Sequence, residues 1–411
     1  MTDLAQQMLL LGEQAKTAAD ALRSVPAEQR SAGIAAMARH IRAATPAILA
    51  ANATDVAAAT RLVDRLRLDE ARIEAMAASL DIIASLPDVV GQEMARWTPK
   101  SGLEIARIRT PIGVIGMIYE SRPNVTADAA ALCLRSANVV ILRPGSEAFA
   151  SCVAINDALQ AGLADVGLPP HIVQLVPTPD RAAVGMMLEG LGGTIELIIP
   201  RGGKPLVERV TNESRVPTLG HLEGLCHSYV HAAADPAMAV AIVRNAKMRR
   251  TSVCGSTETL LIDRAVAPSL LPRIAAALTD CELRGDDEAR AIVPMTAATE
   301  ADWSCEYLEP ILAVRIVAGL DEAIAHIRRY GTGHTEAIIT DDESAADAFL
   351  NQVDAAIVLH NASTQFADGG EFGFGGEIGI ATGKLHARGP VGPEQLTSFK
   401  YVVRSGGRIR P

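Results

Sequence analysis

The pattern of hydrophobic and polar positions divides the chain into a helical beginning and a longer part in which strands and helices alternate. Residues 3–88 are rich in alanine and place apolar side chains at helical spacing beside charged faces, which predicts several amphipathic helices. From about residue 104, short apolar runs alternate with helical stretches. A first series of buried strands is predicted over 112–119, 139–142, 172–176 and 195–199, with helices near 126–137, 147–163, 181–190 and 204–213.

A second series has the same texture. Strands are predicted over 227–231, 258–262, 311–317, 337–340 and 356–360, with helices near 236–250, 267–279, 321–330 and 343–352. Such alternation indicates parallel sheets covered by helices, so we predict an α/β fold with two doubly wound domains. Two further stretches, 97–110 and 397–403, alternate apolar and polar residues as exposed strands do. Exposed strands often pair across subunits, and we therefore expect a homo-oligomer.

The bulk composition narrows the class of protein. A chain of 411 residues exceeds the size at which one core keeps growing, so two or three domains are expected. The formal net charge is −10 and no basic block is present, which argues against nucleic acid as a partner. No apolar run approaches the roughly 18 residues of a membrane helix. The N-terminus lacks the basic and apolar segments of a signal peptide, so a cytoplasmic protein without membrane contact is expected.

Cys254 is the strongest candidate for chemistry in the chain. It follows a helical stretch that carries Lys247, Arg249 and Arg250, and it precedes Gly255 and an apolar strand. Positive charge and free backbone N–H groups stabilise the thiolate, which is the nucleophilic form of cysteine. A lone cysteine is more often a buried core residue. The polar, glycine-containing surroundings nevertheless favour a nucleophile here.

Two strand-to-helix turns have the chemistry of an anion site. One, over 140–147, brings Arg143 and a Gly-Ser pair to the start of a helix. The other, over 198–204, contains Gly202 and Gly203 before Lys204. Helix N-termini at strand ends bind phosphates through free N–H groups. Either turn alone could be an ordinary connection, but the pair favours a dinucleotide, which would meet the nucleophile between two α/β domains.

With these features, the chain resembles the aldehyde dehydrogenase superfamily, and within it the branch that reduces L-glutamyl 5-phosphate. The resemblance covers nearly the whole chain and is most specific over 111–126, 245–261 and 372–390. It implies an aldehyde dehydrogenase-like fold, two doubly wound α/β domains with a small β flap for oligomerisation. We expect a cofactor-binding domain over 1–92 and 111–225, a catalytic domain over 226–392, and oligomerisation strands over 93–110 and 393–411.

The resemblance also implies a reaction. Cys254 would form a thioester in the NADPH-dependent reduction of L-glutamyl 5-phosphate to L-glutamate 5-semialdehyde, the second step of proline biosynthesis from glutamate. Hydrolytic aldehyde dehydrogenases carry a glutamate that activates water, and it lies roughly 33 residues before the catalytic cysteine. In this chain the residue 33 positions before Cys254 is His221, and Glu223 follows two residues later. That difference favours release of phosphate over hydrolysis. The alternatives are a hydrolytic aldehyde dehydrogenase that oxidises a small aldehyde, and a non-catalytic nucleotide-binding protein.

Site roles follow from the same resemblance. Asn124 is the candidate amide for the oxyanion, with capping of the next helix as its alternative. Glu306 matches the glutamate that holds the nicotinamide ribose, with an exposed loop carboxylate as its alternative. Arg143 and Ser146 would address the adenosine ribose, where a guanidinium suits the 2′-phosphate of NADPH. The adjacent Glu147, also a candidate for binding the cofactor, leaves room for the ribose diol of NADH as the alternative. The candidates for binding the substrate, otherwise solvated loop residues, are Ser121, Arg122, Lys384, His386 and Arg388.

The remaining expectations concern metals, partners and one departure from the family. The six cysteines are widely spaced, and His221, His227 and His334 lack the spacing of metal ligands. We therefore expect neither disulfides nor a metal, and we predict structural roles for these histidines. Gly255 stands where the family usually places asparagine. A labile acyl phosphate would favour transient contact with glutamate 5-kinase, although no residue of the chain indicates one.

Overall fold

The computed structural model describes residues 3–60 and 63–410, which form two compact units. The first unit comprises Met1–Gly220, Gly373–Gly379 and Val391–Pro411, and the second comprises His221–Phe372 and Ile380–Pro390. Five residues lie outside the described ranges, among them the first two of the N-terminus that was examined for a signal peptide: Met1, Thr2, Arg61, Leu62 and Pro411.

The alanine-rich beginning of the chain is helical, as predicted. Small residues let these helices pack closely: a Cβ added at Gly162, on α7, would lie 2.6 Å from the backbone nitrogen of Met37 on α2. No helix among the described residues is both long enough and apolar enough to cross a membrane. The N-terminal helices are α1 (Asp3–Leu22), α2 (Ala27–Ala43), α3 (Thr45–Ala58), α4 (Val63–Leu66) and α5 (Glu70–Ser85).

A parallel sheet with strand order β5-β4-β3-β6, here called the N-terminal sheet, forms the centre of the first unit. Every residue of β3 and β4 is buried, which explains the apolar runs Val114–Tyr119 and Val139–Leu142 in their sequences. Strand order reverses between β3 and β6, and such sheets bind ligands beyond the carboxyl ends at that point. The elements are β3 (Val114–Tyr119), α6 (Val125–Arg135), β4 (Val139–Pro144), η1 (Ser146–Ala148), α7 (Phe149–Asp165), β5 (Val173–Leu175), α8 (Arg181–Leu188), β6 (Leu197–Arg201) and α9 (Lys204–Glu213).

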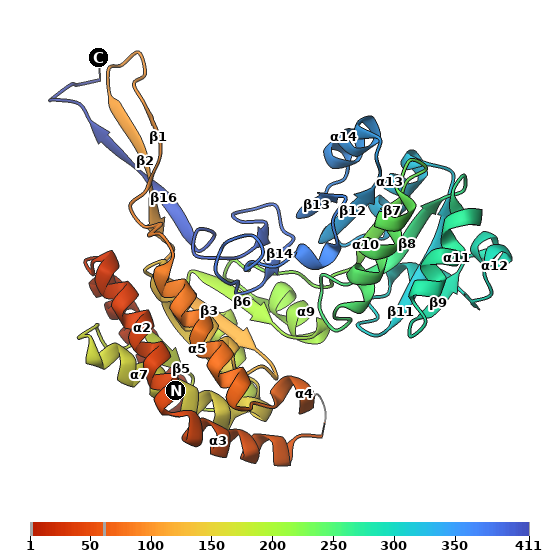
Figure 1. The fold of residues 1–411 in the computed structure, drawn as a ribbon. Helices are drawn as coiled ribbons and strands as arrows, with labels where there is room; N and C mark the ends of the chain where they lie inside the picture. The colour runs from red at the N-terminus through yellow and green to blue at the C-terminus, as the bar shows by residue number, and fades with distance from the viewer. Residues whose placement is uncertain (1–2, 61–62, 411) are drawn as a thin grey trace. The chain divides into compact units, whose positions relative to one another are not determined.

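An antiparallel sheet with strand order β1-β2-β16, here called the arm, extends from the first unit (Figure 1). It consists of β1 (Glu93–Trp97), β2 (Glu104–Pro111) and β16 (Thr397–Arg404). The predicted single strand over 97–110 is wrong, because a turn with Gly102 at a φ of 74° interrupts it. Trp97, Phe399 and Tyr401 remain exposed on the arm.

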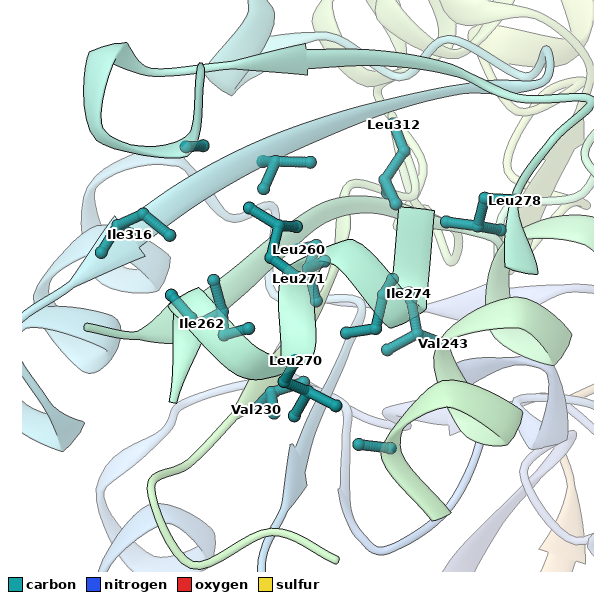
Figure 2. Close-up of a cluster of buried hydrophobic side chains, with 14 of the residues drawn as sticks. Val230, Val243, Leu260, Ile262, Leu270, Leu271, Ile274, Leu278, Leu312 and Ile316 are labelled. Atoms are coloured by element: carbon teal, nitrogen blue, oxygen red, sulfur yellow. The ribbon is translucent and has the colours of Figure 1, made fainter. Parts of the chain in front are cut away.

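The second unit is built on a parallel sheet with strand order β10-β9-β11-β8-β7-β12-β13, here called the C-terminal sheet. Leu260 and Ile262 on β8 belong to the hydrophobic cluster of Figure 2, which includes helix α11, whereas Leu261 between them belongs to a cluster with α13 and α14. Both faces are therefore covered, and the predicted doubly wound fold is confirmed. The short, polar elements β9, β10 and α12 were not predicted.

The elements of the second unit, in chain order, are β7 (Cys226–Val230), α10 (Pro236–Met248), β8 (Thr257–Asp263), α11 (Ala267–Ala277), β9 (Glu282–Gly285), α12 (Asp287–Ile292), β10 (Thr296–Ala297), η2 (Glu300–Ser304), β11 (Ile311–Val317), α13 (Leu320–Tyr330), β12 (Thr335–Ile339), α14 (Glu343–Gln352), β13 (Ile357–His360), η3 (Thr364–Phe366), β14 (Ile380–Ala381) and β15 (Gly389–Pro390).

The unit boundaries differ from the segments predicted from the sequence. The second unit begins at His221, before the expected start at residue 226, and the segment Gly373–Gly379 belongs to the first unit. Gly375 explains the second difference, because a Cβ there would lie 2.9 Å from the Leu86 side chain at the end of α5. The N–H of Ile378 also donates to the Val391 carbonyl, 3.0 Å away, within the same unit.

Replacement of a buried leucine in Figure 2 should destabilise the second unit. Leu271 on α11 is fully buried, so Leu271→Ala should cost about 2–5 kcal/mol by leaving a cavity. The melting temperature followed by circular dichroism measures the loss. Leu350→Ala on α14 is the matched control, since Leu350 is 37% exposed. Equal losses for the two variants would contradict the assignment of this cluster as a core.

Candidate active site

Cys254 lies in the turn between α10 and β8, and the residue as a whole is partly exposed. The turn is anchored from several sides. The Gln365 side chain donates to the carbonyls of Ala246 (3.0 Å) and Arg250 (2.9 Å), and the thiol of Cys226 donates to the Cys254 carbonyl (3.1 Å). These hydrogen bonds hold in place the backbone that carries the thiol, and Cys254 lies in a turn beside the core rather than in a strand of it.

Two histidines lie beside this thiol. The sulfur of Cys254 and one nitrogen each of His221 and His334 all lie within 4.8 Å of one another, and the two rings meet edge to face with centroids 4.8 Å apart. Nδ1 of His221 donates to the Ile380 carbonyl at 2.6 Å, and Nδ1 of His334 lies 2.9 Å from the Thr335 hydroxyl. These contacts fix both rings and leave each Nε2 for the site. The prediction of merely structural roles for His221 and His334 is therefore wrong.

The site forms at the amino ends of neighbouring strands. Cys254 precedes β8, Gly224 precedes β7 and His334 immediately precedes β12, and these strands are adjacent in the order β8-β7-β12. Parallel strands start at the same edge of a sheet, so residues distant in sequence converge there. His227, by contrast, points into the interior of the sheet, where its Nδ1 lies 2.8 Å from the buried Glu336 carboxylate.

Cys254 differs from the other cysteines in its protonation. Burial raises the pKa of the Cys254 thiol, but the charge of His334, hydrogen bonding from both histidines and the charge of His221 outweigh burial and hold the pKa well below its ordinary value. Burial raises the pKa of each other cysteine, to about 12 in Cys152 and about 11 in Cys281: Cys133, Cys152, Cys226, Cys281 and Cys305. Cys254 is thus the cysteine prepared to react as a thiolate.

The three cations that were expected to stabilise the Cys254 thiolate interact elsewhere or face solvent. Lys247 is fully buried and its Nζ lies 2.5 Å from the Glu258 carboxylate, so its charge is neutralised, while Arg249 and Arg250 are exposed. The prediction that Lys247 stabilises the thiolate is therefore wrong, and the histidines supply that charge instead. Glu258 also accepts the N–H of Leu308 at 3.2 Å, so the buried pair fixes the loop that carries Glu306.

Glu306 is half-buried, which excludes the alternative of an exposed loop carboxylate. Its Oε1 accepts the N–H of Gly224 at 2.9 Å. Burial raises the pKa of Glu306, the Gly224 N–H opposes the rise and the negative charge of Cys254 adds to it. The carboxylate that was predicted to hold the nicotinamide ribose is thus electrostatically coupled to the thiol.

Two glycines make room for the turn of Cys254. A Cβ at Gly224 would lie 2.3 Å from the Cys254 carbonyl oxygen and 2.6 Å from its Cβ. A Cβ at Gly255 would lie 3.1 Å from the Thr364 carbonyl oxygen. The Cβ of an asparagine at position 255 would therefore make a tight contact with η3.

Several predicted residues of the first unit gather at the carboxyl edge of the N-terminal sheet. Ser121, at a left-handed φ of 47°, donates its N–H (2.9 Å) and hydroxyl (2.7 Å) to Glu147. Gly203 donates its N–H to Glu120 at 2.9 Å, and a Cβ at Gly202 would lie 2.5 Å from the same carboxylate. Glu120 was not predicted from the sequence as part of this group. Its position directly after the buried strand β3 could have indicated that its carboxylate lies at the carboxyl edge of the sheet.

The other predicted residues of this unit have separate surroundings. Arg143 is buried and donates to the Pro179 carbonyl at 2.8 Å, while Ser146 is exposed at the start of η1. Asn124 is at the N-cap position of α6, but its side chain donates to Asp128 at 2.9 Å and, among the described residues, caps no N–H. The capping alternative for Asn124 is therefore excluded. Arg122 is half-buried.

In the glycine-rich loop of the second unit, two predicted substrate-binding cations pair with the same aspartate. Lys384 forms an ion pair with Asp354, and Nη1 of Arg388 lies 2.7 Å from the same carboxylate. These two pairings hold the pKa of Asp354 below its usual range. His386 adopts a left-handed φ of 67° in this loop. Lys384 and Arg388 would have to leave Asp354 in order to bind an anionic substrate.

Alkylation by iodoacetamide should report the lowered pKa of Cys254. Because only thiolate reacts, the rate at Cys254 should stay near its maximum as the pH falls through neutrality, while Cys281, with a pKa of about 11, should react only in alkali. His334→Gln should move the Cys254 profile to higher pH. Peptide mass spectrometry after timed alkylation measures both rates, and parallel profiles for the two cysteines would contradict the geometry.

A methyl group at position 224 should disturb the nucleophile. Gly224→Ala must displace the Cys254 turn, because backbone atoms lie within 2.7 Å of the new Cβ. We expect slower alkylation of Cys254 and lower activity with the fold retained. Gly185→Ala on α8 is the control, since its Cβ would meet no described atom within 4 Å. Unchanged reactivity of Cys254 in Gly224→Ala would show that the turn is not held as described.

Comparison of the sequence with known proteins identifies the family of this chain. The model of the aldehyde dehydrogenase family matches residues 5–309. A gamma-glutamyl phosphate reductase of Caulobacter vibrioides is 62% identical, with 98% of this chain and 99% of that protein covered. One from Hyphomonas neptunium is 60% identical, with 99% of this chain and 97% of that protein covered.

Solved structures agree with the sequence comparison. The crystal structure of gamma-glutamyl phosphate reductase from Thermotoga maritima is similar with a TM-score of 0.95 and 41% identity, covering 98% of this chain and all of that one. An acetylating aldehyde dehydrogenase from Geobacillus thermoglucosidasius, at 19% identity and a TM-score of 0.72 over the full length of both chains, shares the fold. The chain belongs to the aldehyde dehydrogenase family, and the two curated relatives described above are named gamma-glutamyl phosphate reductase.

Proposed function

We propose that this oxidoreductase converts L-glutamyl 5-phosphate to L-glutamate 5-semialdehyde and inorganic phosphate with NADPH, in the cytoplasm, as the second step of proline biosynthesis. The observation that carries the proposal is the Cys254 sulfur held between the imidazoles of His221 and His334. Relatives at about 60% identity over nearly the full length, named gamma-glutamyl phosphate reductase, support the choice of substrate.

The chain's residues would act as follows. The Cys254 thiolate attacks the δ-carbonyl carbon of the acyl phosphate, a C–S bond forms, and the C–O bond to phosphate breaks. NADPH supplies the hydride that reduces the resulting thioester. Collapse of the hemithioacetal then breaks the C–S bond and returns the electron pair to sulfur, where His221 and His334 stabilise the thiolate as a leaving group.

The position of His221 supports transfer from phosphate rather than hydrolysis. A carbonyl oxygen only accepts hydrogen bonds, so Nδ1 of His221 must carry the proton that binds the Ile380 carbonyl. When Nε2 is also protonated toward the thiolate, the ring has no lone pair with which to activate water. A glutamate at this position could do so, as in the hydrolytic branch of the superfamily.

Two groups of residues keep the roles proposed for them toward a nicotinamide dinucleotide. In the first, Gly202 and Gly203 lie at the N-terminus of α9, beyond the carboxyl end of β6, where a diphosphate could replace the Glu120 carboxylate. In the second, the half-buried Glu306 could accept ribose hydroxyls. NADPH remains the proposed form, and a 2′-phosphate would have to draw Arg143 from the Pro179 carbonyl.

The arm supports a homo-oligomer. Strand β16 is at the edge of its sheet, bonded to β2 on one side, and Phe399, Tyr401 and Val403 on it are exposed. An exposed apolar edge strand is a template for pairing with a second copy. Contact with glutamate 5-kinase stays an expectation from the chemistry of the substrate. The proposed roles of Asn124, Ser146, Ser121, Arg122, Lys384, His386 and Arg388 stay predictions.

The reverse reaction tests the proposal. Purified protein is incubated with L-glutamate 5-semialdehyde, NADP⁺ and phosphate, and reduced cofactor is followed by absorbance. We expect turnover that requires phosphate, because phosphate must attack the thioester to form the acyl phosphate. Cys254→Ala should lose turnover by several orders of magnitude, and Cys281→Ser should keep it.

Other outcomes identify the alternatives. Rapid acid formation without phosphate would show a hydrolytic aldehyde dehydrogenase. Full turnover in Cys254→Ala would contradict the thioester route. Cofactor binding without turnover under either condition would favour a nucleotide-binding protein.

A further inference from the structure

The Cys254 cluster has a donor set that the proposed reaction does not fully use. One sulfur and two imidazole nitrogens lie within 4.8 Å of one another. Zinc binds thiolate at about 2.3 Å and imidazole nitrogen at about 2.0–2.1 Å, so ligand atoms of a tetrahedral site lie about 3.5 Å apart. A small rotation of the Cys254 side chain, with the contacts of both rings kept, would bring the three donors closer to this separation. Thiolate and imidazole are ligands for zinc and other soft divalent metals, not for magnesium or calcium.

The contacts around both histidines resemble those of metal ligands. Metal-binding histidines usually donate their second ring nitrogen to a carbonyl or another acceptor, which fixes the tautomer. Here Nδ1 of His221 donates to Ile380 at 2.6 Å, and Nδ1 of His334 lies 2.9 Å from the Thr335 hydroxyl. In each ring Nε2 is therefore the nitrogen that would face a metal bound to the Cys254 sulfur.

His334 supplies an independent observation. Its side chain is fully buried, and apart from the interaction of the ring with the Cys254 thiol, its Nε2 has no hydrogen-bond partner among the described residues. A buried polar atom without a partner is costly and calls for an explanation such as a bound ion. A metal on the Cys254 sulfur would give this nitrogen a partner.

The surroundings suit a site with an open position. Cys254 is partly exposed, so a water could complete a tetrahedron of three protein ligands. The Glu306 carboxylate interacts electrostatically with Cys254 and His221, and its negative charge favours a cation there. The turn that carries the sulfur is anchored by Gln365, so the ligands are held before a metal arrives.

We propose that Cys254, His221 and His334 bind one Zn²⁺, or another soft divalent metal, and that this binding reversibly inhibits the enzyme. The metal would occupy the sulfur lone pair that attacks substrate, so metal binding and acyl transfer exclude each other. The proposal rests on the geometry of the cluster and holds whether or not the substrate is glutamyl phosphate.

Metal binding by the full chain, measured without substrate, tests the site. Equilibrium dialysis with Zn²⁺ should give one tight equivalent per chain, and that zinc should slow alkylation of Cys254 until a chelator restores it. Co²⁺ in place of Zn²⁺ should give a thiolate-to-cobalt charge-transfer band. Cys254→Ser should abolish the band, and His334→Gln should weaken Zn²⁺ binding at least about 10- to 100-fold.

Controls separate this site from other thiols. Cys281→Ser should bind Zn²⁺ as the unaltered chain does, and melting temperatures show which variants are folded. If His334→Gln is unfolded, Cys254→Ser carries the test, since serine differs from cysteine only in having oxygen in place of sulfur. Undiminished zinc binding in Cys254→Ser, or bound zinc that leaves Cys254 alkylation unchanged, would overturn the proposal. If the protein does not catalyse the proposed reaction, zinc binding and alkylation of Cys254 can still be measured, so the two proposals are tested separately.

Discussion

The contact of the Cys254 sulfur with the imidazoles of His221 and His334 is the interaction on which the chemistry of this chain depends. Burial opposes ionisation of the thiol, and in five other cysteines of the same chain burial prevails. At Cys254 the two histidines reverse the balance. The C-terminal sheet achieves this by starting β8, β7 and β12 side by side, so that residues before each strand meet at one edge.

Much of the fold could be predicted because buried parallel strands contain apolar runs, such as all of β3, Val139–Leu142 in β4 and Leu260–Ile262 in β8. Short polar elements such as β9 and α12 leave no such signal. Cys254 could be found from its own surroundings. Its partners could not, because His334 is far away in the sequence and becomes a neighbour only through strand order. Lys247 was misread because Glu258, which neutralises it, lies in the following strand.

The features that make Cys254 reactive also explain its susceptibility to soft metals. A thiolate between two imidazoles is both a nucleophile for an acyl carbon and a ligand set for zinc. The buried pair of Lys247 and Glu258, and the N–H of Gly224 on Glu306, hold the surrounding loops so that both chemistries meet the same fixed geometry. Access to the sulfur would then decide which of them occurs.

Direct titration of the thiolate tests the central claim. The ultraviolet absorbance of thiolate is recorded against pH for the unaltered chain and for Cys254→Ser, and the difference isolates the signal of Cys254. The account predicts an inflection well below the value of about 8.5 for an unperturbed cysteine. An inflection at or above that value would show that the histidines do not hold Cys254 as a thiolate.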